Sequence, residues 1–204
     1  MTPDQILRLF SRPDGSYLFA RWGRPIVPVV FGVDDATLPV VKGAVEAVVA
    51  LAGHRMAETD PELGANLMIF FLRDWDELLA VPNLDRLVEG LGELVPRLQA
   101  RNASQYRAFR FEASGAIKAA FCFVRMDAAM ARMPAEDLAL LQAVQVILLW
   151  GDAAFREASP LALSGEVAVL RPEIASVIRA CYDPRMPDAA TDSSHALRVA
   201  ARVG

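Results

Sequence analysis

A helical pattern at residues 134–150 constrains the fold of this chain more than any other feature. Apolar side chains return there every three or four residues, as they do on one face of an α-helix. The residues expected on that face are Leu138, Leu141, Gln145 and Leu148. Gln145 and its helical neighbour Gln142 are unusual in such an apolar stretch. A buried glutamine amide without a hydrogen-bond partner costs about 1–3 kcal/mol, so the two residues predict polar neighbours in the fold.

Short apolar runs and helical patterns alternate along the rest of the chain. Strands are predicted at 17–22, 26–33, 66–72, 106–112 and 116–124, with turns at 23–25 and 113–115. Helices are predicted at 36–52, from 74, at 84–101, at 172–182 and at 192–202, whereas 151–170 is expected to be irregular. No internal repeat or long linker divides the chain. We therefore expect one α+β domain at 17–204, with a mixed β-sheet backed by helices, after an N-terminal lead-in at 1–16.

The charge and hydropathy of the chain exclude several classes of protein. Hydrophobic residues make up 54% of the 204 residues, which is too many for a disordered protein. The formal net charge of −4 argues against a nucleic-acid partner. Charged residues occur early in the chain, and no apolar run reaches the ~18 residues that a membrane-spanning helix needs. We expect a cytoplasmic protein that has no membrane partner.

Four short segments occur in an order that carries a resemblance. They are Arg21-Trp22-Gly23-Arg24-Pro25-Ile26, Ala65-Asn66-Leu67, Gln142-Ala143-Val144-Gln145 and Tyr182-Asp183-Pro184-Arg185-Met186. In these segments, and in the strand hairpin that precedes the helix at 134–150, the chain resembles an uncharacterised bacterial family of zincin-like domains. The resemblance covers roughly residues 17–200, and it implies a zincin-like fold.

Zincin peptidases carry the longer pattern H-E-x-x-H-x-x-G-x-x-H-D, in which the histidines bind zinc and the glutamate activates water. The corresponding residues here are Leu141, Gln142, Gln145, Leu148, Gly151 and Asp152. Leucine and glycine offer no metal ligand, and a neutral glutamine is a poor one. Gln142 cannot act as a general base, because an amide does not titrate in the useful range. The resemblance thus implies a degenerate domain without zinc or peptidase chemistry, while an ordinary amphipathic helix explains the same residues equally well. Both interpretations predict no metal and no cofactor.

The remaining metal-ligating and nucleophilic side chains are dispersed along the sequence. His54 follows a helix-ending glycine and His195 lies in the last predicted helix, each without another ligand type nearby. Cys122 and Cys181 are predicted to be small buried thiols rather than a disulfide. A metal shared between two chains through His54 or His195 stays open at this point.

We therefore expect a non-catalytic domain that binds a protein or peptide partner in a cleft. The residues expected to line it are Gln142, Gln145, Trp150 and Asp152. Glutamine amides there could pair with an extended peptide backbone.

Two alternatives stay open. The first is a hydrolase that uses carboxylates assembled in space without zinc; its candidates are Asp152, Glu173 and Asp183. The second is a structural subunit that uses an exposed apolar patch on the last helix, at Leu197, Ala200 and Val203. The oligomeric state is not predicted.

Overall fold

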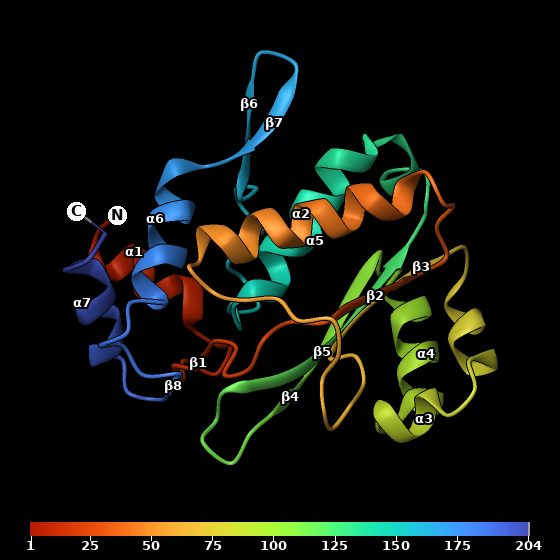
Figure 1. The fold of residues 1–204 in the computed structure, drawn as a ribbon, viewed down its shortest axis with the longest axis horizontal. Helices are drawn as coiled ribbons and strands as arrows, with labels where there is room; N and C mark the ends of the chain where they lie inside the picture. The colour runs from red at the N-terminus through yellow and green to blue at the C-terminus, as the bar shows by residue number, and fades with distance from the viewer. Residues whose placement is uncertain (204) are drawn as a thin grey trace.

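The computed structural model describes residues 1–203, and a four-stranded mixed sheet lies at its centre (Figure 1). In spatial order the strands are β2 (Pro28–Phe31), β3 (Leu67–Leu72), β5 (Ile117–Arg125) and β4 (Gln105–Phe111). The first three run parallel to one another, whereas β4 is antiparallel to β5 and forms one edge of the sheet. The predicted α+β architecture with a mixed sheet is confirmed.

Helices cover both faces of this sheet, which explains why β3 and β5 are almost continuously apolar. One face carries α2 (Thr37–Leu51) and α5 (Ala135–Ile147). The other face carries the 3₁₀ helix η1 (Trp75–Ala80), α3 (Leu84–Leu87) and α4 (Leu91–Ala100). Side chains of β3 alternate between the two apolar clusters: Ile69 and Phe71 pack toward α2 and α5, and Phe70 toward α4.

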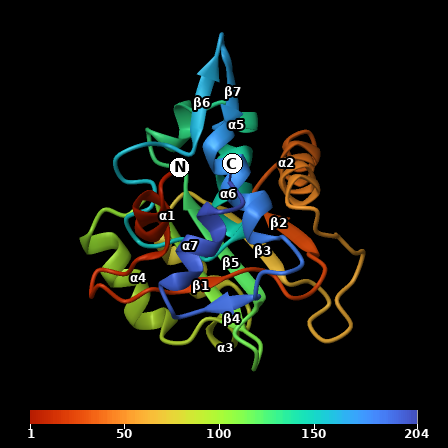
Figure 2. The same cartoon turned by 90° about the vertical axis from the view of Figure 1, so that its left-hand side faces the viewer.

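The chain termini build a third layer beyond one end of the sheet (Figure 2). It contains α1 (Pro3–Phe10), α6 (Pro172–Cys181), α7 (Ser194–Ala200) and a two-stranded pairing of β1 (Phe19–Ala20) with β8 (Ala189–Ala190). A capping box between Thr2 and Gln5 starts α1, which packs against α7. Ile6 and Phe10 of α1 are fully buried in the apolar cluster shared with α2 and α5, so the expected lead-in at 1–16 contributes to the main core.

Several predicted elements differ in the structure. The stretch 151–170, expected to be irregular, holds an antiparallel hairpin of β6 (Leu161–Ser164) and β7 (Val167–Leu170), which projects from the body (Figure 1). Two short apolar runs on either side of Gly165 are the sequence feature that indicates this hairpin, and Gly165 has a positive φ of 66° at the turn. The predicted strands at 17–22 and 26–33 are shorter, and β1 pairs with β8 rather than with β2. The predicted helix at 84–101 divides at Gly90, whose φ is 68°.

The face predicted for the helix at 134–150 is also wrong in detail. The helix ends at Ile147, and Leu148 is already extended. Its buried residues are Leu138, Ala139, Gln142, Ala143, Val144, Val146 and Ile147, whereas Leu141 and Gln145 are only partly buried. Because the sheet and α2 both pack against α5, its buried side is wider than a single stripe and is not centred on the predicted face. Among residues 1–203, no helix is both long and apolar enough to cross a membrane.

Candidate functional site

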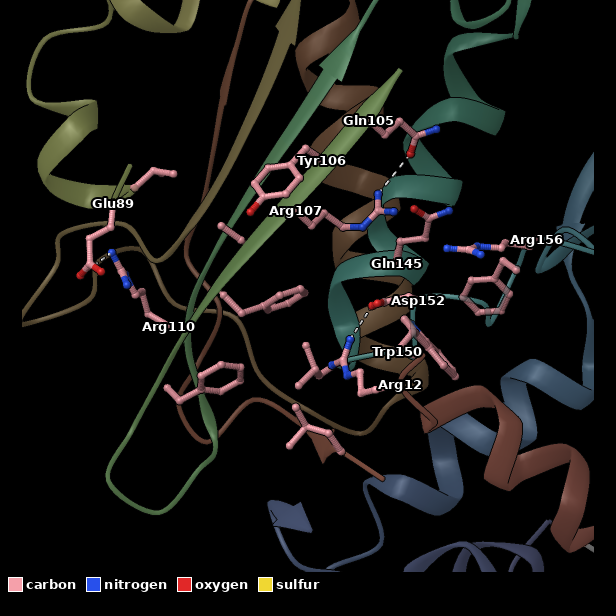
Figure 3. A pocket seen from close by; sticks show the side chains of 18 of the residues that line it. Arg12, Glu89, Gln105, Tyr106, Arg107, Arg110, Gln145, Trp150, Asp152 and Arg156 are labelled. Carbon is pink, nitrogen blue, oxygen red and sulfur yellow. Dashed lines mark hydrogen bonds and ion pairs between the residues drawn. The ribbon is translucent and has the colours of Figure 1, made fainter. Parts of the chain in front are cut away.

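A groove of about 880 Å³ lies between the edge strand β4 and the chain that follows α5 (Figure 3). All seven residues of β4 line it. The opposite wall is formed by Gln145 of α5 and by 149–152, with Arg12, Phe155 and Arg156. Three of the four predicted cleft residues, Gln145, Trp150 and Asp152, thus lie on one side of the groove and face the edge strand β4.

The free edge of β4 can be assigned from one hydrogen bond beside it. Arg125 N donates to Ser104 O over 2.8 Å, just before the first paired residues of β4 and β5. Because hydrogen-bonded and non-hydrogen-bonded pairs alternate in an antiparallel ladder, Tyr106 and Ala108 point their backbone groups toward β5. The backbone N–H and C=O groups of Gln105, Arg107 and Phe109 therefore point toward the open edge. Within residues 1–203, no strand pairs with that edge.

Gln142 lies behind the groove and does not line it. Its side chain is fully buried, and its amide is engaged by three neighbours. Nε2 donates to Gln105 Oε1 over 3.1 Å, while Oε1 accepts from Cys122 Sγ at 3.2 Å and from Arg107 Nη1 at 3.4 Å. Gln142 therefore joins α5 to β4 and β5.

Gln145, one helical turn further along, has the opposite environment. Its Oε1 atom is buried, yet it accepts no hydrogen bond from any group in the described part of the chain. Its side chain lines the groove, in the same wall as Trp150 and Asp152 (Figure 3). A buried acceptor without a donor is unfavourable, and a rotation of the side chain that exposes Oε1 to a ligand N–H in the groove would relieve that penalty.

Trp150 and Asp152 attach the N-terminal helix to this wall. The Trp150 ring stacks on Phe10, with centroids 5.4 Å apart and planes 8° from parallel, and its Nε1 donates to Val144 O. Asp152 forms an ion pair with Arg12 at 2.7 Å, and about half of its carboxylate side chain remains exposed. Trp150 is thus largely a packing residue, and Asp152 presents its charge at the rim.

Gly151, which the resemblance aligns with the third zinc ligand, has a packing role. Its N–H donates to Leu9 O over 2.6 Å, and a Cβ atom there would lie 2.4 Å from Ser11 O. Any side chain at this position would displace the end of α1. The close approach of two backbones therefore explains the glycine.

Four arginines and two carboxylates line the groove, although the whole chain is acidic. Arg12 pairs with Asp152, and Arg110 lies 3.5 Å from Glu89. The other two arginines, Arg107 and Arg156, have no carboxylate within ion-pair distance among residues 1–203. The groove therefore carries an uncompensated positive charge.

The carboxylates proposed for an alternative active site are not assembled into one. Asp152 lines the groove, but Glu173 and Asp183 do not. Glu173 lies near Arg171, and Asp183 pairs with Arg202 at 3.4 Å. The Arg185 backbone N–H lowers the pKa of Asp183, which keeps that carboxylate ionised.

The two histidines and two cysteines lie apart from the groove. His54 Nε2 meets Arg24 O at 2.8 Å, and His195 Nδ1 meets the Tyr17 hydroxyl at 2.7 Å inside the core. Cys122 and Cys181 are free and buried, as predicted, and burial raises the pKa of both thiols. Leu197 on the last helix is exposed, whereas Ala200 at its end and Val203 beyond it are partly packed against the core.

Two of the four segments that carry the resemblance, 21–26 and 182–186, meet at the end of α5. The Tyr182 hydroxyl donates to Ile147 O over 2.9 Å and accepts from Trp22 N at 3.3 Å. Trp22 Nε1 donates to Val146 O, and the Arg21 guanidinium lies 5.3 Å from the centre of the Tyr182 ring. These contacts satisfy the last carbonyls of α5 and hold the wall of the groove in place.

No protein-family model, curated protein or solved structure matches this chain. Within residues 1–203, no three His, Cys, Asp or Glu side chains are grouped so that they could hold a metal ion.

Proposed function

We propose that this protein is a zincin-like domain that binds an extended segment of a protein partner in the groove beside β4, without catalysing its cleavage. One observation carries the proposal: the free backbone edge of β4 lies across the groove from the unpartnered Gln145 amide. A peptide can pair its main chain with such an edge while its side chains enter neighbouring pockets. Gln145 would then accept a hydrogen bond from the same peptide after its side chain turns Oε1 toward the groove.

Two further features support binding without hydrolysis. Gln142 has no titrating group, and its amide is already engaged in the layer behind the groove. Leu141 and Gly151, at two of the ligand positions, offer no donor atom. A cytoplasmic location belongs to the same proposal, because both cysteines are free and buried, as in a reducing compartment.

The test is to select short extended peptides on the protein and then methylate their backbone nitrogens. Alternate residues of an added strand point their N–H groups toward β4, so methylation of one alternate set should abolish binding and methylation of the other should not. Phe109→Pro removes an outward N–H and should also abolish binding, with Phe109→Ala as its matched control. If both methylated sets bind equally, the segment does not add to β4.

A structural subunit remains the second candidate, because one observation favours it. The projecting β6–β7 hairpin exposes Leu163, Val167 and Val169, with 74% of Leu163 accessible. Apolar side chains gathered on a projecting hairpin are typical of assembly contacts. If the hairpin holds copies together, the paired substitution Leu163→Ser and Val167→Ser will reduce the mass observed in solution. An unchanged mass would remove this candidate.

A further inference from the structure

We infer that the groove selects segments rich in aspartate or glutamate, and that Arg107 and Arg156 bind a carboxylate side chain of the segment; this inference rests on the proposed function. Of the charged groups in the groove, Asp152 and Glu89 are already paired with Arg12 and Arg110. A segment that enters the groove therefore meets two cations, Arg107 and Arg156, that no carboxylate of the described residues neutralises.

Arg107 is held in position before any ligand arrives. Its Nη1 donates to Gln105 Oε1 at 3.1 Å and to Gln142 Oε1 at 3.4 Å. Its Nε and Nη2 atoms donate to no group within residues 1–203. Since the buried Gln142 is itself fixed by Cys122, the guanidinium is oriented with donors to spare. An arginine ordered in this way loses little side-chain entropy when it binds a carboxylate.

Arg156 approaches from the opposite wall. It follows Phe155, whose ring packs edge-on against Trp150 with centroids 5.0 Å apart. Its own side chain is exposed and makes no hydrogen bond with the described residues. As drawn in Figure 3, the Gln145 side chain lies between those of Arg107 and Arg156. A segment on β4 would therefore find two charged donors beside one neutral acceptor.

Side-chain direction along β4 places the acidic residues on one face of the segment. Phe109 packs toward the core shared with α5, whereas Tyr106 and Ala108 pack toward the α4 side. Because side chains alternate along a strand, Arg107 shares the α5 face with Phe109 and Gln105. Side chains of the added strand that share this face lie beside Arg107. We therefore expect Asp or Glu at the alternate positions of that face nearest Arg107, rather than along the whole segment.

The test is selection from a random library of peptides about eight residues long, a typical strand length, with both peptide ends blocked. Enrichment of Asp or Glu at alternate positions supports the inference. A selected pool without acidic residues overturns it but leaves peptide binding in place. If no pool is enriched over that on Phe109→Pro, peptide binding itself fails. Blocked ends are essential, because binding that requires a free C-terminal carboxylate would contradict recognition of side chains.

Variants of the two arginines give a second, independent readout. For a selected acidic peptide, Arg156→Gln should weaken binding by about tenfold at low ionic strength, and the effect should shrink as salt is added. The same variant should leave unchanged the affinity for the peptide whose acids are replaced by Gln or Asn. Arg107→Lys should weaken binding less than Arg107→Gln, because the lysine keeps the charge but loses the planar donor pair.

Arg110→Gln is the matched control, because Arg110 lines the same groove but lies on the other face of β4, beside Glu89. It should change the affinity less than Arg156→Gln does. Equal losses in both variants would indicate attraction by net charge alone and would overturn the assigned site. A polyanion such as a single-stranded oligonucleotide should not compete with the acidic peptide; full competition would contradict recognition of a carboxylate segment.

Discussion

Gln142 Nε2 donates a hydrogen bond to Gln105 Oε1 over 3.1 Å, and this contact joins the buried face of α5 to the edge strand of the sheet. Gln105 also accepts from Arg107 over 3.1 Å, so the two glutamines and the arginine form one small polar network in the wall of the groove. The Gln142 amide thus helps to order a neighbouring arginine, Arg107.

The two glutamines of α5 should respond in opposite ways to replacement by leucine. Gln142→Leu leaves the Cys122 thiol without its acceptor and removes one of the two donors to Gln105, and we expect a loss of about 1–3 kcal/mol in the free energy of unfolding. Gln145→Leu removes a buried acceptor that has no donor, so stability should be unchanged or slightly higher while peptide binding falls. Urea unfolding of the two variants measures the difference. Equal losses would contradict the contrast between their environments.

Gly151→Ala should destabilise the protein through the N-terminal helix. The new Cβ would lie 2.4 Å from Ser11 O, so α1 must shift away from the wall of the groove, with a loss of about 1–3 kcal/mol. Gly43→Ala is the control, because Gly43 lies within α2 with open space around it and should gain about 0.5–1 kcal/mol. Thermal unfolding of both variants tests this prediction. If Gly151→Ala has the stability of the parent protein, the end of α1 can move away from the wall without a cost in free energy.

Stability should fall as the pH drops from about 6.5 toward 4, because His195 is neutral in the core. Burial, with smaller contributions from Arg198 and Arg21, lowers its pKa from 6.5 to about 4. The unfolded chain therefore binds a proton that the folded chain does not. Over this interval the loss from His195 amounts to about 3 kcal/mol. It is complete below pH 4 and absent above pH 6.5.

Urea unfolding between pH 4 and 7 measures this slope. His195→Gln should flatten it. His54→Gln is a necessary comparison, because burial also lowers the pKa of His54 and that residue contributes in the same direction. If the pH dependence of stability persists in His195→Gln and disappears in His54→Gln, then His54 causes it and the prediction for His195 is wrong.

Asp60 should be the most sensitive acidic residue outside the groove. It is 5% exposed and accepts from the backbone N–H groups of Glu62 and Leu63, from Arg24 and from Asn66. Burial raises its pKa, but these hydrogen bonds outweigh that effect and lower it to about 2. Asp60→Asn keeps the shape without the charge and should lower the free energy of unfolding by about 1–3 kcal/mol. Glu62→Gln, at an exposed partner of Arg24, should have a smaller effect; equal effects would show that the loop is held by surface charge alone.

Sequence patterns predicted the parts of this fold that depend on local order. The hairpin of β4 and β5, the buried strand β3 and the helices α2, α5 and α6 are each long or strongly patterned, and all of them form, although the buried face of α5 is not the predicted one. Two-residue strands such as β1 and β8 have no such pattern. Phe19 and Ala190 pair although 170 residues separate them, and only the folded chain brings them together.

Sequence alone decided that residues 141–152 carry neither the histidine ligands nor the glutamate of the zincin pattern, since side-chain identity decides whether an atom can bind a metal or accept a proton. Tertiary structure decided which of the two glutamines has hydrogen-bond partners for its side-chain amide. Gln142 and Gln145 are chemically identical and one turn apart, yet one meets Gln105, Arg107 and Cys122 while the other faces the groove. The difference arises because β4 and β5 pack against only one side of α5, and helical periodicity does not reveal which side the sheet will occupy.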